Sequence, residues 1–332
     1  MITTGYFLGA LLPRDNSTET RARIDTLSQE LITDRHADLG EALRSDFSQV
    51  SVAAHELRTY RAHAASLLQA ETWGQGLQTA LGGMQDDLQR LFEAIPASLT
   101  GTGDMDLAGI GEIGSGVLSD LLSQLDARVG GRGLFQNGHP GASPPPDAQT
   151  VMADIAALAG GATDLVGLTA AVDAYFAPGG PYGLAAATLP ADPVAFPTGP
   201  AETAAFQISA ASPEIVTALQ KAALAAALPD AGFPMSETDR EAARSSLIEG
   251  IATATSGLTG LRGRIGAVEA RISDIADRLD SARARQETAL GDATAPDPNE
   301  TATRLQAEMS RLETTYAITA RRSRLRLTDF IR

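Results

Sequence analysis

The chain has 332 residues and a formal net charge of −15, from 26 Lys+Arg against 41 Asp+Glu. A net negative charge argues against nonspecific binding to DNA, RNA or anionic lipid, because affinity for phosphates comes mainly from cationic side chains. Cysteine is absent, which excludes disulfides, thiolate metal sites and cysteine nucleophiles. An apolar content of 43% with only 5% aromatic residues favours close-packed helices around a buried core.

The N-terminal apolar run from Tyr6 to Leu12 has no Lys or Arg before it and no A-x-A cleavage pattern after it, so we expect no general secretory signal. No stretch approaches the roughly 18 apolar residues of a membrane-spanning helix. Asn16 and Glu19 form a capping box, which predicts that the first helix begins just after Pro13.

Heptad spacing predicts long amphipathic helices over residues 43–95. The first register has Leu43, Val50, Leu57 and Ala64 in one row and Phe47, Ala54 and Leu68 in the other. After residues 73–76 a second register begins, with Leu77, Met84 and Leu91 alternating against Leu81, Leu88 and Ile95. Pro96 ends it. A Gly-rich linker is expected around 100–116, followed by a third helix from Val117 that closes at Gly130 and Gly131.

The middle of the chain is rich in Ala, Pro and Gly. Residues 136–150 have the composition of a loop. Helices are expected at 151–176 and 213–228, with an irregular or short-stranded piece at 178–210.

The strongest periodicity comes next. Two complementary heptad rows are formed by Ile251, Leu258, Ile265, Ile272 and Leu279 and by Ala254, Leu261, Val268, Ile275 and Ala282. A seam of more than four heptads requires a partner helix. After a break at 291–300, a last helix begins near Pro298 and carries Leu305, Met309, Leu312, Tyr316 and Ile318.

These patterns predict a mainly α fold: a long antiparallel helical rod formed by the N- and C-terminal halves, with a smaller mixed or irregular insert domain. The expected segments are an N-terminal assembly helix region (1–40), the two halves of the rod (41–135 and 246–292), an outward-facing insert (136–245) and a C-terminal assembly helix (293–332). The rod is expected to pack through Leu43, Phe47, Val50, Leu57, Leu258, Leu261, Ile265, Val268, Ile272, Ile275 and Leu279.

No pattern of catalytic residues emerges. The sequence "GIGEIG" (109–114) matches a dinucleotide-binding fingerprint, but no strand precedes it, and a linker explains it better. The four histidines, His36, His55, His63 and His139, lack metal-ligand spacing. The carboxylates fall on polar helix faces, as at Asp86, Asp87, Asp274 and Asp277. We therefore expect no enzyme activity, no cofactor and no metal.

The last 22 residues are basic and apolar. Arg321, Arg322, Arg324 and Arg326 spread around a helix instead of lining one face, which disfavours a membrane-surface helix and leaves an assembly helix at least as well supported.

Four stretches together resemble the flagellin superfamily, in particular its hook-filament junction branch. They are "LSQELITDRHADL" (27–39), where Thr33 and Arg35 match the family's turn and Asp34 replaces its glycine; "LLSQLDARVGGRGLFQNG" (121–138); "RGRIGAVEARISDIADR" (262–278); and the terminal "DPNETATRLQAEMSRLETTYAITARRSRLRLTDFIR" (297–332). In the second stretch the family turn is carried by Gly131, Arg132, Leu134, Phe135 and Gly138.

The resemblance implies an extracellular structural subunit of the bacterial flagellum, exported unfolded by the flagellar type III apparatus without a cleaved signal peptide. Its partners would be other copies of itself, other hook-associated proteins, flagellin and an export chaperone, with no nucleic acid and no membrane. Its assembly interface would comprise Leu27, Leu31, Leu305, Met309, Leu312, Tyr316, Leu325, Leu327 and Phe330. The alternatives are a minor flagellin of the filament and a coiled-coil membrane-surface protein with a basic tail.

Overall fold

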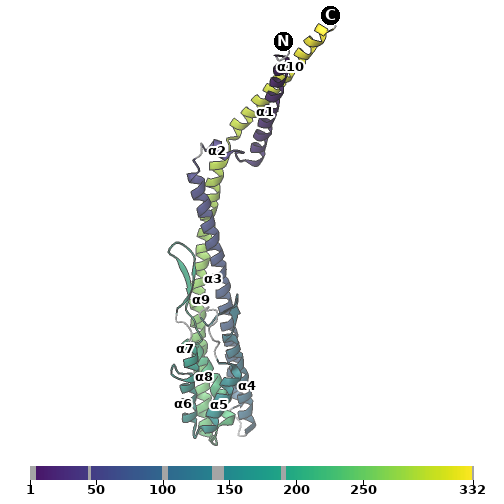
Figure 1. Ribbon diagram of the computed structural model, residues 1–332. Helices are drawn as coiled ribbons and strands as arrows, with labels where there is room; N and C mark the ends of the chain where they lie inside the picture. Colours follow the sequence, from purple (N-terminus) through teal and green to yellow (C-terminus); the bar gives the residue numbers. More distant parts are fainter. Residues whose placement is uncertain (1–4, 44–45, 99–103, 137–145, 188–191, 331–332) are drawn as a thin grey trace. The chain divides into compact units, whose positions relative to one another are not determined.

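The protein is mainly helical in a computed structural model (Figure 1). The structure describes all residues except 1–4, 44–45, 99–103, 137–145, 188–191 and 331–332, and it does not describe the side chains of 5–16, 96–98, 104–106, 187 and 322–330. By its internal contacts the chain divides into two compact units. Unit 1 comprises residues 1–61 and 279–332, and unit 2 comprises residues 62–278.

Unit 1 is made of helices, and aspartates cap the starts of two of them. It contains α1 (Gly5–Thr33), α2 (Leu39–Ala42), the start of α3 (Ser48–Ser98), the end of α9 (Glu237–Thr294) and α10 (Pro298–Phe330). The Asp38 carboxylate accepts the Gly40 N–H at 2.8 Å at the start of α2, and Asp297 accepts the Asn299 N–H at 2.8 Å at the start of α10. Each carboxylate satisfies backbone donors that lack a partner within the helix.

The first helix begins earlier than the sequence predicts. α1 starts at Gly5 and continues through Pro13, so Asn16 lies within the helix and is not its cap. A proline inside a helix removes one backbone hydrogen bond, but the helix can continue on both sides of it. The capping-box prediction at Asn16 is therefore wrong.

The two longest helices, α3 and α9, run antiparallel in unit 2. The Gln78 amide donates to the Arg262 carbonyl at 3.0 Å, and further along the Gln85 amide donates to the Thr259 hydroxyl at 2.8 Å. The predicted heptad rows extend beyond these polar contacts along both helices. They are buried at Leu77, Leu81, Met84, Leu88, Leu91 and Ile95 on α3 and at Ile251, Ala254, Leu258, Leu261, Ile265, Ile272 and Ile275 on α9. α3 does not break at residues 73–76, and Trp73 is buried in the packing.

The Gly-rich segment expected as a linker is a helix. α4 (Asp104–Leu125) contains most of it, and α4 packs closely against α8 (Pro213–Ala227) and the short 3₁₀ turn η1 (Leu228–Asp230). A Cβ atom at Gly114 would lie 2.6 Å from the Ala226 backbone nitrogen. The glycines therefore allow the two helix backbones to approach each other, and the linker prediction for 104–116 is wrong.

Eight residues of α8 are buried. Besides α4, this helix contacts α9, where the Lys221 side chain lies over Gly250 and the Glu214 side chain lies over Gly257. Arg264 of α9 also pairs with Glu214 at 2.9 Å. Small residues on α4, α8 and α9 thus allow three helices to pack at short distance.

Three further helices and two small hairpins complete unit 2. The helix expected at 151–176 is two helices, α5 (Ala148–Gly161) and α6 (Leu165–Phe176), because Asp164 caps the second by accepting the Gly167 N–H at 2.6 Å. The stretch expected to be irregular or short-stranded contains α7 (Pro181–Ala187) and a hairpin of β3 (Val194–Pro197) with β4 (Thr203–Phe206). The other hairpin joins β1 (Arg128–Val129) to β2 (Arg132–Gly133).

Candidate assembly surface

The candidate surface lies on α1 and α10, which pack side by side and antiparallel in unit 1 (Figure 1). The Arg21 guanidinium donates to the Tyr316 hydroxyl and lies 5.6 Å from the centre of its ring. Two residues along α1, Arg23 lies 3.6 Å from the Glu308 carboxylate. Arg21 and Arg23 therefore fix the register of the helix pair at two points.

The α1–α10 seam buries little apolar surface. Leu27, Leu31, Leu305 and Leu312 are all half-buried, and the buried side chains in the described parts of these two helices are those of Thr20 and Thr301. Among the described side chains of α1 and α10, none of the large apolar ones is fully buried. Because helix stability in proteins comes mainly from burial of an apolar face, this pair alone is weakly stabilised.

Part of the apolar face of α10 stays exposed beside α1. Met309 and Tyr316 stand one heptad apart, next to the half-buried Leu305 and Leu312, and they are 51% and 43% exposed. We call these four residues the α10 stripe. Ile318, 61% exposed, falls on nearly the opposite side of the helix from Tyr316. The side chains of Leu325, Leu327 and Phe330 lie outside the described part of α10.

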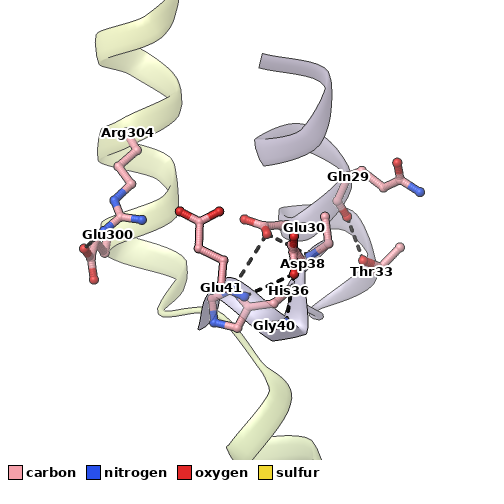
Figure 2. A network of polar contacts seen from close by, with 10 residues as sticks. Gln29, Glu30, Thr33, His36, Asp38, Gly40, Glu41, Glu300 and Arg304 are labelled. Carbon is pink, nitrogen blue, oxygen red and sulfur yellow. Dashed lines mark hydrogen bonds and ion pairs between the residues drawn. The ribbon is translucent and has the colours of Figure 1, made fainter. Parts of the chain in front are cut away.

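A tight corner ends α1 (Figure 2). Asp34 follows the last helical residue with φ of +53°, the left-handed conformation that commonly ends a helix and that glycine adopts most readily. Glu30 lies 3.6 Å from the His36 imidazole and accepts the Ala37 N–H at 2.8 Å. The His36 N–H donates to the Thr294 carbonyl at 3.0 Å, which joins the corner to the end of α9.

Most of the residues predicted to pack the rod are buried. They are Leu57, Leu258, Leu261, Ile265, Ile272, Ile275 and Leu279. Leu43, Val50 and Val268 are half-buried. Phe47 differs from the prediction because it is 45% exposed. It lies between α2 and α3, where the backbone is not helical, so the heptad phase does not carry its side chain into the seam.

The predicted family turn forms a two-residue hairpin. Gly130 and Gly131 have φ of +58° and +78°, as a turn of this length between β1 and β2 requires. Leu134 and Phe135 are buried directly after it. The Arg132 guanidinium lies 5.3 Å from the centre of the Trp73 ring. The helix before the turn ends at Leu125, and Gly138 lies outside the described residues.

Charge is distributed unequally between the two units. Unit 1 has 17 carboxylates and 16 arginines, a formal charge of −1. Unit 2 has 24 carboxylates and 10 basic residues, a formal charge of −14. Nearly all the net charge of the chain therefore belongs to unit 2, which sequence reasoning missed because it treated the charge as a property of the whole chain.

Among the carboxylates whose side chains are described, that of Asp87 is buried, against the expectation that these groups lie on solvated faces. Asp87 of α3 pairs with Arg90 and accepts a hydrogen bond from the Gln124 amide of α4 at 2.7 Å. Burial raises the pKa of Asp87, and the hydrogen bond and charge of Arg90 oppose this shift. Arg90 also bridges to Asp120 at 2.8 Å, so the cluster fastens α4 to α3.

The described residues contain no group of three or more His, Cys, Asp and Glu placed to hold a metal ion. None of the helices, over the residues described, is long and apolar enough to cross a membrane. A scan against protein-family models finds no match to this chain, and a search of curated proteins finds no similar protein.

Proposed function

We propose that the protein is a self-assembling structural subunit whose copies associate through α1 and α10. The observation that carries this proposal is the α10 stripe, which is only half covered by α1 within a unit of almost no net charge. An exposed apolar stripe on a marginally packed helix pair gains stability when a further helix covers it. A nearly neutral unit can pack against its own copies without strong repulsion.

Within this class, we propose a subunit of the hook-filament junction type in the bacterial flagellum. Support comes from the corner at Asp34, because this residue takes a left-handed conformation at the position where the resembled family turn has glycine. The turn at Gly130 and Gly131, followed by buried Leu134 and Phe135, supports the second resembled stretch in the same way. The chain would then be extracellular and exported without a cleaved signal peptide.

The proposed architecture is an antiparallel rod with an outward-facing insert. The halves at 41–135 and 246–292 would form the rod, and 136–245 would face outward. Support comes from the polar contacts between Gln78 and Arg262 and between Gln85 and Thr259, which align α3 and α9 in antiparallel register. Other hook-associated proteins and flagellin would then contact the terminal helices.

Self-association of the purified full chain tests the proposal directly. Met309→Gln removes an exposed apolar side chain from the α10 stripe and keeps a good helix former. Ile318→Gln is the matched control, because it makes the same kind of change on the other side of the helix. Sedimentation velocity should show weaker association for Met309→Gln alone. Equal association of both variants and the wild type would contradict an assembly surface at the stripe.

The flagellar assignment needs a test in cells. Deletion of the gene should leave hooks without filaments and release flagellin into the medium, and electron microscopy with analysis of the medium would reveal both. Normal flagella would refute it. A minor flagellin would instead be abundant in sheared filaments. A membrane-surface protein would float with anionic liposomes in a manner that depends on Arg321 to Arg326.

A further inference from the structure

Half of the formal charge of unit 2 comes from one stretch that has no Lys or Arg. Between Arg132 and Lys221 the sequence contains no Lys or Arg, while it contains seven carboxylates. Two of these are matched by arginines of α9: Glu214 by Arg264 at 2.9 Å and Glu202 by Arg278 at 3.7 Å. The rest of the stretch adds negative charge that no nearby basic residue in the sequence offsets.

Unit 1 differs because its 17 carboxylates are balanced by 16 arginines, and several of these charges are paired. Neighbouring turns of a helix join Arg23 to Glu19 and Arg283 to Glu287, at 2.7 and 2.8 Å. A similar pair on α10 joins Arg304 to Glu300. Paired charges of opposite sign produce a weak field at distance, so unit 1 of one copy repels unit 1 of another only slightly.

We propose that ionic strength controls self-association of this protein, because the charge of unit 2 repels other copies while unit 1 provides the contact. The inference rests on the proposed self-assembly. Each copy that joins the assembly adds a further charge of −14 in its unit 2. Salt shortens the range of this repulsion, from about 30 Å at 0.01 M to about 8 Å at 0.15 M. Packing of apolar side chains in unit 1 is not weakened by the same change.

Sedimentation velocity of the full chain in NaCl at about 0.01 M and about 0.15 M measures the effect. We expect association to tighten by at least about tenfold between the two concentrations. MgCl₂ at matched ionic strength should give the same association as NaCl, because screening depends on ionic strength alone. A response to Mg²⁺ at far lower ionic strength would overturn the proposal in favour of a bound cation.

Two matched variants separate the charge of unit 2 from the charge of the whole chain. The first neutralises four exposed carboxylates of unit 2: Asp86→Asn, Glu112→Gln, Asp192→Asn and Glu249→Gln. The second neutralises four of unit 1: Asp25→Asn, Glu41→Gln, Asp280→Asn and Asp292→Asn. Both bring the formal charge of the chain from −15 to −11. Circular dichroism should first show that each variant retains the helical content of the wild type.

The unit 2 variant should associate more tightly than the wild type at low salt, and its association should change less with salt concentration. The unit 1 variant should show no such gain, because its contact unit becomes positively charged. Equal behaviour of the two variants, or wild-type association that does not change with salt, would refute the proposal while leaving self-assembly intact. A wild type that stays monomeric at every salt concentration would refute the proposed function and this inference together.

Discussion

Replacing Asp34 with glycine should stabilise the end of α1. Asp34 has φ of +53° directly after the last helical residue, and its exposed side chain makes no hydrogen bond or ion pair among the described residues. A left-handed conformation costs an L-residue about 1–2 kcal/mol, and aspartate less than most. Glycine relieves this cost but loses more backbone entropy on folding. The net gain expected for Asp34→Gly is therefore about 0.5–1 kcal/mol.

Hydrogen exchange of the α1 backbone amides is the suitable assay, because a helix end opens locally without global unfolding. A gain of about 1 kcal/mol slows exchange through this opening by about fivefold. Asp34→Ala is the control, since it removes the carboxylate but keeps the Cβ atom, and it should speed exchange. If Asp34→Ala protects the α1 amides as well as Asp34→Gly does, the left-handed conformation of residue 34 is not what lowers the stability of this helix end.

Three further predictions concern unit 2. Gly114→Ala should lower the free energy of unfolding by about 1–3 kcal/mol, because its Cβ would lie 2.6 Å from the α8 backbone. Gly116→Ala, which has nothing within 4 Å of its Cβ, should raise the free energy of unfolding by up to about 1 kcal/mol. Equal melting temperatures of the two variants would contradict the close approach of α4 and α8. Arg132→Gln should lower the free energy of unfolding by about 0.5–2 kcal/mol and shift the fluorescence emission of Trp73. An unchanged emission would contradict the contact between the Arg132 guanidinium and the Trp73 ring. Burial raises the pKa of Asp87 above 3.8, so the folded state holds this proton to higher pH than the unfolded state does. Urea unfolding should therefore show the wild type losing stability relative to Asp87→Asn as pH rises from about 4 to about 7, and a relative gain would contradict this sign.

The heptad seam of α9 could be predicted from the sequence because one periodic signal specifies both the helix and its buried face. Ile251 and Leu258 are among the positions where this prediction is confirmed. The break before α10 is confirmed for a similar reason: α9 ends at Thr294, and Asp297 with Pro298 forms a strong helix start. Local signals of this kind do not depend on how distant parts of the chain pack.

The glycines of α4 show where sequence reasoning failed. Glycine disfavours a helix locally, and the segment was therefore assigned to a linker. The position of α8, which is distant in sequence, decides the outcome, because Gly114 lets the two backbones approach each other. The spacing of Gly111 and Gly114, three residues apart on one helical face, is the signal that would have predicted a close helix contact.

The candidate surface was only partly accessible to prediction. The sequence predicts a last helix that carries Leu305, Met309, Leu312, Tyr316 and Ile318, and the family resemblance implies the first four as assembly residues. How much of these side chains α1 covers depends on the geometry of the helix pair, which periodicity does not contain. The concentration of charge in unit 2 likewise required the division of the chain into units.

The corner at the end of α1 also has a mechanical consequence. In unit 1 one helix ends at Thr33 and another ends at Thr294. The hydrogen bond from the His36 backbone N–H to the Thr294 carbonyl places these two interruptions side by side, at one level of the unit. A continuous helix resists bending through its ladder of backbone hydrogen bonds, and here both ladders are interrupted side by side. Bending applied to unit 1 will therefore be absorbed at this level, and α1 and α10 can tilt together as a pair while their own hydrogen bonds stay intact.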